Sequence, residues 1–254
     1  MSGFAATGFE FRHRFWFIFA IFLLAYALNG FFPGNACVVL VRHFMPKGSP
    51  FFPVWMHALF GIAALVVLTG AALRTWGTAY LSAGVMTDRR LHSERLTADG
   101  PFRFVRNPLY IGLFLMAAGL SATTDVPGGV LLVVLMTLFV LRLALREEAG
   151  LAAAQGEAYD AYRRCVRRFL PSLRPRLPAS GAVPLWPQAF VAEFMVWSFG
   201  VALAVLAVSL NGRLFWEVFA VGLGVGMLTY TFQRRRTRPG SKASADGPDK
   251  GAAE

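Results

Sequence analysis

Two adjacent carboxylates, Glu147 and Glu148, directly follow a long apolar stretch, and Arg142 lies inside that stretch, about one helical turn before them. An ionisable side chain within an apolar segment is costly, so it is a functional hypothesis by default. A guanidinium can orient an anionic group, and a carboxylate can pair with a cation or accept a proton. Arg142 and Glu148 are therefore the candidate catalytic residues. The simpler alternatives are that Arg142 reaches the lipid headgroups and that both glutamates lie on a solvated helix.

A second polar motif, Asn107-Pro108, precedes another apolar stretch. Proline favours the first turn of a helix and asparagine suits the capping position before it, so the motif predicts a helix start. The free amide groups of a helix start can also bind the carboxylate of a cofactor. A structural role for Asn107 therefore does not exclude a binding role.

Six apolar stretches could position these motifs, since a transmembrane helix needs roughly 20 mostly apolar residues. They run over residues 14–32, 53–76, 109–123, 127–145, 188–210 and 214–232. The third is short, and the turn around Asp125 and Pro127 leaves room only for a tight hairpin with the fourth. With 56% hydrophobic and 15% charged residues, the chain is too apolar for a soluble domain of 254 residues. The sequence predicts an all-α, polytopic integral membrane protein with about six transmembrane helices.

The net charge of +11 comes from arginines that lie between the apolar stretches and near both ends of the chain. In a soluble protein this charge would suggest a nucleic-acid partner, but in a membrane protein it records orientation. The basic groups precede the first stretch, follow the second, fourth and sixth, and fall on one side only if the number of spans is even. Both termini are therefore predicted to be cytoplasmic. A bacterial inner membrane without a nucleic-acid partner is the expected setting.

Two polar segments, 91–112 and 146–171, flank the third and fourth stretches. Because those stretches are expected to form a hairpin, the two segments must meet at the same membrane face. A composite site at the cytosolic face follows from this topology.

The first segment contains GPFRFVRNPLYIG over residues 100–112, and the second contains Glu147-Glu148 followed by Gly156, Tyr159, Tyr162 and Pro171. These motifs resemble the isoprenylcysteine carboxyl methyltransferase and phospholipid methyltransferase family. Its signature has Gly-Pro-Tyr-Arg-Tyr before Arg-His-Pro, then a pair of glutamates, two spaced tyrosines and a closing proline. The resemblance covers roughly residues 73–171.

The resemblance implies methyl transfer from S-adenosylmethionine to a lipophilic or lipidated substrate. It implies cofactor contacts from Leu96, Thr97, Phe102, Arg106, Asn107, Pro108, Leu109, Tyr110, Glu147 and Tyr159. The chemistry is compatible, because the sulfonium and amino groups of the cofactor are cations that Glu147 can pair with and the rings of Phe102 and Tyr110 can attract. In this interpretation Arg142 orients a carboxylate acceptor, whereas Glu148 takes the proton from an amine acceptor. No cysteine and histidine cluster has metal-ligand spacing, so no metal site is predicted.

The sequence departs from the family pattern in three places. Asn107 stands where the family has histidine, so a titratable ring is lost, although an amide still donates and accepts hydrogen bonds. Arg167 stands where proline is frequent, and the last two apolar stretches follow the core instead of preceding it. The acceptor therefore stays open between carboxyl O-methylation and phospholipid N-methylation. An NADPH-dependent reductase of the steroid and sterol type and a non-enzymatic membrane scaffold are the competing hypotheses.

The chain is expected to divide into four parts. Residues 1–72 hold the first two spans, 73–177 the methyltransferase-like core, and 178–236 the last two spans. Residues 237–254 form a tail too polar to bury enough apolar surface for order. Glu193, a turn or two inside the fifth stretch, could line a cavity.

Overall fold

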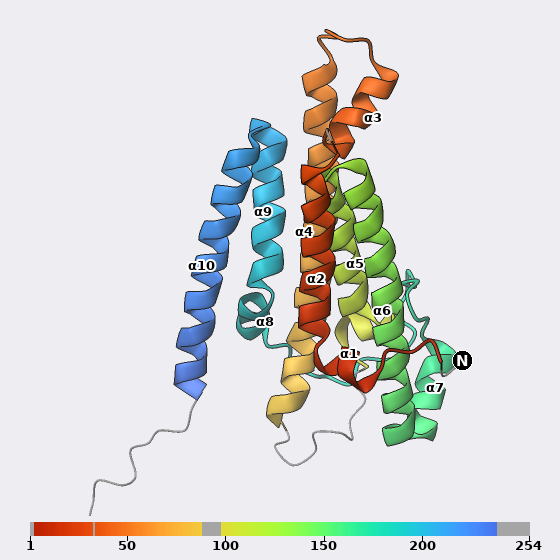
Figure 1. Ribbon diagram of the computed structural model, residues 1–254. Coiled ribbons are helices and arrows are strands. Elements are labelled where there is room, and N and C mark those ends of the chain that lie inside the picture. The colour runs from red at the N-terminus through yellow and green to blue at the C-terminus, as the bar shows by residue number, and fades with distance from the viewer. Residues whose placement is uncertain (1–2, 33, 88–97, 238–254) are drawn as a thin grey trace, which may run out of the picture.

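The computed structural model describes residues 3–32, 34–87 and 98–237, and this part of the chain is helical without a strand. The α-helices are α1 (Gly8–Arg12), α2 (Arg14–Ala27), α3 (Ala36–Phe44), α4 (Phe52–Thr87), α5 (Pro108–Leu120), α6 (Val126–Gln155), α7 (Glu157–Cys165), α8 (Trp186–Ala192), α9 (Phe194–Ser209) and α10 (Gly212–Thr237). Three short 3-10 helices are η1 (Leu28–Gly30), η2 (Gly100–Arg103) and η3 (Ser121–Thr123). Helices α2, α4, α5, α6 and α9 form an upright bundle with α10 at its outer edge (Figure 1). The predicted all-α class is confirmed.

Within the described residues, three helices, α4, α6 and α10, are long and apolar enough to cross a membrane, and α8 with α9 makes a fourth span if the bent pair counts as one. The stretches 14–27 and 108–123 form shorter apolar helices. Each predicted stretch thus corresponds to helix, but length and composition support three or four spans, so six spans and cytoplasmic termini stay predictions. The tail from residue 238, and Leu96 and Thr97, lie outside the described residues.

The fifth apolar stretch is not the single continuous span that the sequence predicts. Helices α8 and α9 meet at Glu193 with a bend of 66°. Glu193 is buried at this break, and its carboxylate binds Arg74 and Thr78 on α4. Helix α3 lies between the first two predicted apolar stretches; its start is capped by Asn35, which accepts from the backbone amides of Cys37 and Val38.

Helices α4 and α5 approach closely because glycines line their contact. A Cβ on Gly112 would lie 2.7 Å from the carbonyl oxygen of Gly70, and one on Gly119 would lie 2.7 Å from that of Ala63. Small residues of this kind let helix backbones pack at short range within a membrane. Gly112, which closes the 100–112 motif, therefore has a packing role.

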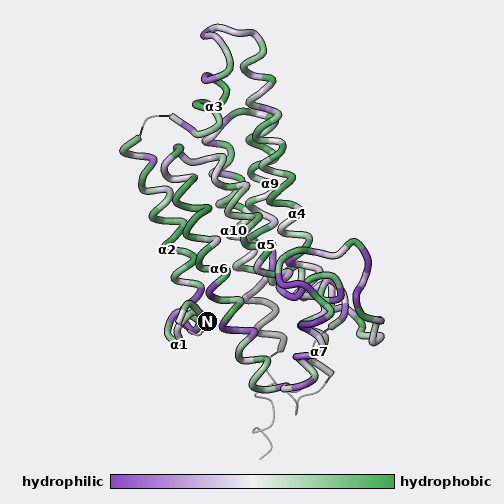
Figure 2. The backbone as a smooth tube through the Cα atoms, turned by 90° about the vertical axis from the view of Figure 1, so that its right-hand side faces the viewer, coloured by the Kyte–Doolittle hydropathy of each residue, from purple (hydrophilic) through white to green (hydrophobic). Residues whose placement is uncertain are grey.

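The hairpin between α5 and α6 is confirmed. Its turn runs through η3 to Asp125, whose side chain caps α6 by accepting from the amide of Gly128 at 2.6 Å. Helices α4 and α6 continue past their predicted ends, to Thr87 and Gln155, so the glutamate pair lies on a helix and not in a loop. Hydrophobic residues dominate the bundle, and hydrophilic residues gather around α7 (Figure 2). We call the end of the bundle that carries α7 the polar end.

Candidate functional site

The two polar segments that flank the hairpin meet at the polar end, as predicted. A backbone hydrogen bond joins them from Arg106 N to Arg167 O at 2.9 Å, and the residues directly after the second segment add Ser172 N to Phe104 O at 3.0 Å and Arg176 N to Arg103 O at 2.8 Å. The hydroxyl of Tyr162 also donates to the carbonyl of Phe102 at 2.9 Å. The segment after α7 therefore runs alongside the motif that precedes α5.

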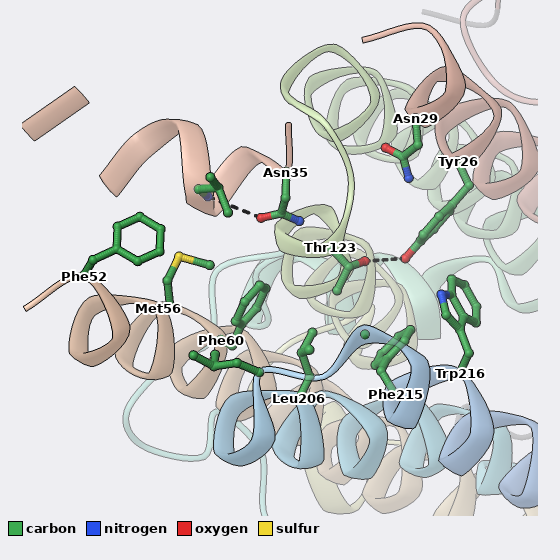
Figure 3. A pocket seen from close by; sticks show the side chains of 13 residues that line it. Tyr26, Asn29, Asn35, Phe52, Met56, Phe60, Thr123, Leu206, Phe215 and Trp216 are labelled. Atoms are coloured by element: carbon green, nitrogen blue, oxygen red, sulfur yellow. Dashed lines mark hydrogen bonds between the residues drawn. The ribbon is translucent and has the colours of Figure 1, made fainter. Parts of the chain in front are cut away.

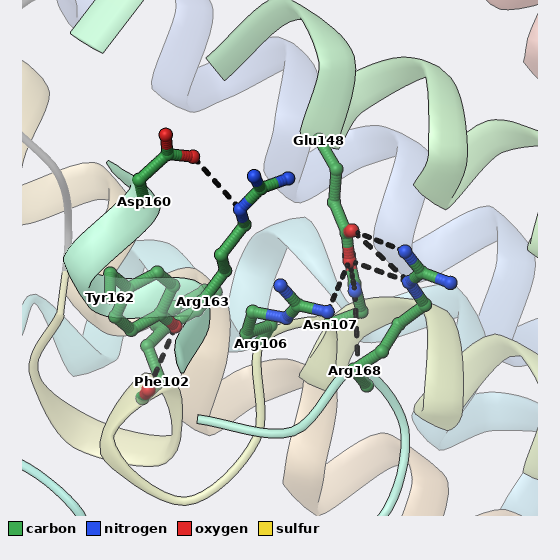
Figure 4. Close-up of polar contacts among 8 residues, drawn as sticks. All are labelled: Phe102, Arg106, Asn107, Glu148, Asp160, Tyr162, Arg163 and Arg168. Carbon is green, nitrogen blue, oxygen red and sulfur yellow. Dashed lines mark hydrogen bonds and ion pairs between the residues drawn. The ribbon is translucent and has the colours of Figure 1, made fainter. Parts of the chain in front are cut away.

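Glu148 is the centre of this junction (Figure 4). Its side chain is buried, and its Oε1 accepts from Asn107 Nδ2 at 2.8 Å and from Arg168 Nε at 3.0 Å. Its Oε2 accepts from Arg168 Nη2 at 2.9 Å, and Arg106 Nη2 lies 3.5 Å from Oε1. Hydrogen bonding to Glu148 raises the pKa of Arg168. Both carboxylate oxygens are thus engaged, and one side chain ties α6 to the start of α5 and to the segment after α7.

Asn107 begins α5 without capping it by its side chain. Pro108 occupies the first turn, which confirms the predicted helix start. The amide of Asn107 donates to Glu148 and, at 3.3 Å, to the carbonyl of Arg168, so the expected side-chain cap is wrong. The first turn of α5 therefore keeps its amide groups without a side-chain acceptor.

Two polar atoms beside Glu148 have no hydrogen-bond partner in the described part of the chain. They are Arg106 Nε and the hydroxyl of Tyr159, both buried. Burial, reinforced by the nearby charge of Glu148, raises the pKa of Tyr159 to about 12, so the hydroxyl stays protonated. Buried polar atoms in native proteins nearly always have partners, so these two are positions where a ligand or water would bind.

Glu147 differs from Glu148 in its surroundings, although the two are neighbours in sequence. Adjacent helix residues point about 100° apart. Glu147 is exposed and lies beside the hydroxyl of Tyr110 in the first turn of α5, whereas Glu148 is buried in the cluster. Tyr110 is half-buried and packs against the hydrophobic cluster formed by Ala6, Phe139 and Leu143. Glu147 is therefore the accessible carboxylate of the pair.

The side chain of Arg142 forms an ion pair with Glu10 and not with Glu148. Its Nη2 donates to both carboxylate oxygens of Glu10, at 2.7 and 2.9 Å, and the ring of Phe4 lies over its guanidinium. The carbonyl of Arg142 also accepts from the amide of Ala6 at 3.0 Å. The segment before α2 thus occupies the guanidinium, and a substrate carboxylate would have to displace Glu10. The catalytic role predicted for Arg142 stays a prediction.

The attachment of this N-terminal segment is expected to weaken in acid. The pKa of Glu10 lies below its usual value, first because the backbone amide of Thr7 donates to its carboxylate and then because Arg142 does. A carboxyl group whose pKa is lower in the folded protein than in the unfolded chain stabilises the fold at any pH above its unfolded pKa of about 4.3. This stabilisation is lost as the pH falls through the folded pKa. A spin label at position 3 should become more mobile over that range. Glu10→Gln should be mobile already at pH 7, and an equal acid transition in both proteins would contradict the assignment.

The remaining predicted contacts differ in accessibility. Phe102 is 8% exposed within η2, so its ring is largely covered, and Leu109 packs its side chain on Gly77 of α4. Sequence reasoning missed Arg168 and named Tyr162 only as part of the motif, without a role at the junction. Arg168 belongs to a basic run that also suits anionic headgroups, so its spacing alone does not identify it.

Two cavities among the described residues differ in their position relative to the predicted site. The larger, of about 410 Å³, lies away from the Glu148 cluster, between the end of α2, α3, the start of α4 and the α9–α10 turn (Figure 3). Its lining includes Tyr26, Phe60 and Trp216 but none of the predicted site residues. The smaller, of about 220 Å³, is lined by Trp76, Tyr80, Asp99, Gly100, Arg103, Phe104, Ala179, Gly181 and Ala182. It therefore borders the 100–104 part of the motif.

Asp99 anchors the rim of the smaller cavity. Burial alone would raise the pKa of its carboxyl, but hydrogen bonds from Ser180 and from the amide of Ala182 outweigh burial and lower it. Asp99 is therefore an ionised carboxylate held against the segment that leads to α8.

Residues 57–157 match the family model described as phospholipid methyltransferase. Comparisons with the curated proteins and with the solved structures gave no match. The matched range includes Asn107, Tyr110, Glu147 and Glu148 and ends before Tyr159. The helices α8, α9 and α10 lie outside it.

Proposed function

We propose that this chain, whose residues 57–157 match the phospholipid methyltransferase family model, transfers a methyl group from S-adenosylmethionine to a lipid-type acceptor at the membrane surface. The family is one of membrane methyltransferases that act on lipid-type substrates. The observation that carries the proposal is the junction at the polar end, where the motif residue Asn107 donates to Glu148 of the glutamate pair. Asn107 directly precedes α5 and Glu148 lies in the last part of α6, so the contact joins the beginning and the end of the α5–α6 hairpin.

The residues present fit the proposed cofactor. Exposed Glu147 offers a carboxylate to its cationic groups, with the ring of Tyr110 beside it. The uncapped first turn of α5 offers amide groups to its carboxylate, and Arg106 Nε and the Tyr159 hydroxyl offer unused hydrogen-bonding positions. When bound, S-adenosylmethionine supplies a methyl carbon made electrophilic by the sulfonium.

The protein's own part in such a displacement is mainly alignment of the acceptor and exclusion of water. We assign Glu148 to holding the site together, because Asn107 and Arg168 already engage both of its oxygens. Proton removal by Glu148, as phospholipid N-methylation would require, would have to break these bonds. This favours Glu147 as the carboxylate that faces reactants.

Ligand binding distinguishes the proposal from its competitors. In purified protein reconstituted in lipid nanodiscs, S-adenosylmethionine and S-adenosylhomocysteine should raise the Tm, and NADPH should not. A ligand at 100 times its Kd adds about 2.7 kcal/mol to the free energy of unfolding, which a thermal-shift titration resolves. A response to NADPH alone would indicate a reductase, and no response to any of them would indicate a scaffold. Transfer of a radiolabelled methyl group into a lipid extract then identifies the acceptor class.

A further inference from the structure

We infer that Glu193, at the break between α8 and α9, is a positioning residue for the cofactor site and acts on it through Arg74. The inference rests on the proposed function and gives the C-terminal helices, which lie outside the matched range, a part in it. It starts from an ion pair between α4 and the α8–α9 break.

The side chains of Glu193 and Arg74 form a bidentate ion pair. Arg74 Nε donates to Glu193 Oε2 at 2.6 Å and Nη2 donates to Oε1 at 3.1 Å. The hydroxyl of Thr78, one helical turn further along α4, donates to Oε1 at 2.8 Å. Glu193 is 4% exposed, and the Arg74 side chain is 21% exposed. The carboxylate is therefore fixed in place on three hydrogen bonds.

A buried ion pair is weak evidence for a stabilising role, because the loss of hydration offsets much of the attraction between the charges. What distinguishes this pair is the third contact of its guanidinium. Arg74 Nη1 donates to the carbonyl of Leu109 at 3.1 Å. Leu109 lies in the first turn of α5, between Pro108 and Tyr110. One guanidinium thus connects Glu193 to the turn that presents the predicted cofactor contacts.

The route of Arg74 across α5 depends on a residue of the motif. A Cβ on Gly112 would collide with Cγ of Arg74 and lie 3.1 Å from its Cδ. Without a side chain at position 112, the arginine can lie across the surface of α5 and reach both Leu109 and Glu193. Gly112 is therefore part of the same arrangement.

The alternative is that Glu193 only holds α9 against α4. The chain offers a matched control for this, because Trp197, one turn further along α9, donates from Nε1 to the hydroxyl of Thr75 at 2.9 Å. This second polar link joins the same two helices and has no hydrogen bond to α5. Loss of the Trp197 link should weaken helix packing without changing the first turn of α5.

The experiment compares Glu193→Gln with Trp197→Phe in nanodiscs, measuring the Kd for S-adenosylmethionine by calorimetry and the Tm without ligand. The glutamine keeps the shape of the side chain but not the charge that orients the guanidinium. We expect Glu193→Gln to raise the Kd about tenfold, the size expected for loss of one charge-assisted hydrogen bond. Trp197→Phe should lower the Tm and leave the Kd unchanged. Equal changes of Kd in the two variants would overturn the inference.

A double variant, Arg74→Met with Glu193→Met, separates positioning from stability a second time. Apolar side chains of similar volume often replace a buried ion pair without loss of stability. The double variant should therefore recover the Tm but not the cofactor affinity, and recovery of both would overturn the inference. A wild-type protein that binds no S-adenosylmethionine would instead reject the proposed function, and the inference with it, so the two failures are distinguishable.

Discussion

Glu148→Ala should destabilise the polar end more than any other single change at the junction, by about 3–5 kcal/mol. The alanine leaves the buried guanidinium of Arg106 without its carboxylate partner and removes the shorter of the two hydrogen bonds that the amide of Asn107 donates. Arg168 contributes less, because its side chain is 38% exposed and can be hydrated when the carboxylate is gone. The effect should appear as a lower Tm in nanodiscs.

The control for this variant is an ion pair of the same kind at the surface. Asp160 pairs with Arg163 at 2.8 Å on α7, and both side chains are about half exposed. Exposed pairs contribute about 0–1 kcal/mol, so Asp160→Asn should barely change the Tm. If Glu148→Ala and Asp160→Asn shift the Tm equally, the junction is not organised by Glu148.

The features that the sequence predicted are those set by local pattern and by topology. The length of each apolar stretch locates a helix, and the short turn at Asp125 allows only a hairpin between α5 and α6. Once α5 and α6 are antiparallel neighbours, the segments at their ends have to meet. For this reason the contact between Asn107 and Glu148 follows from the order of elements, although the residues are 41 positions apart.

The features that the sequence did not predict are charge pairs whose partners share no local pattern. Arg74 and Glu193 are 119 positions apart, and Glu10 and Arg142 are 132 apart. Each of these residues alone suggests a snorkelling side chain, a cavity lining or an exposed helix. Only the packing of α9 on α4, and of the N-terminal segment on α6, shows which charges meet. The break at Glu193 belongs to this class, because the carboxylate is held by a helix far away in sequence.

The sequence also does not predict that Glu147 and Glu148 have different roles. Two adjacent glutamates at the end of an apolar stretch carry the same chemistry. Their roles separate only when the rotation of α6 buries one in the junction and leaves the other exposed. In the structure, Glu148 is therefore the structural carboxylate of the motif and Glu147 is the accessible one.

Glu147→Gln should weaken the binding of S-adenosylmethionine by about 10- to 100-fold while leaving the Tm of the free protein within about a degree of wild type. The affinity falls because a neutral amide cannot pair with the cationic groups of the cofactor. The stability is kept because Glu147 is exposed and outside the Glu148 cluster. Tyr110→Ala should weaken binding as well, through loss of the aromatic face beside Glu147.

Glu217→Gln is the matched control, since Glu217 is an exposed carboxylate on α10 that pairs with Arg213 at 2.8 Å, outside the matched range. The affinity of the Glu217→Gln variant for the cofactor should equal that of the wild-type protein. A titration of S-adenosylhomocysteine, which lacks the sulfonium charge, sharpens the comparison. If Glu147 pairs with the sulfonium, the substitution should weaken S-adenosylmethionine more than S-adenosylhomocysteine; if it pairs with the amino group, both should weaken equally. Unchanged affinity for both ligands in Glu147→Gln would remove Glu147 from the site and leave the proposed cofactor without its carboxylate partner.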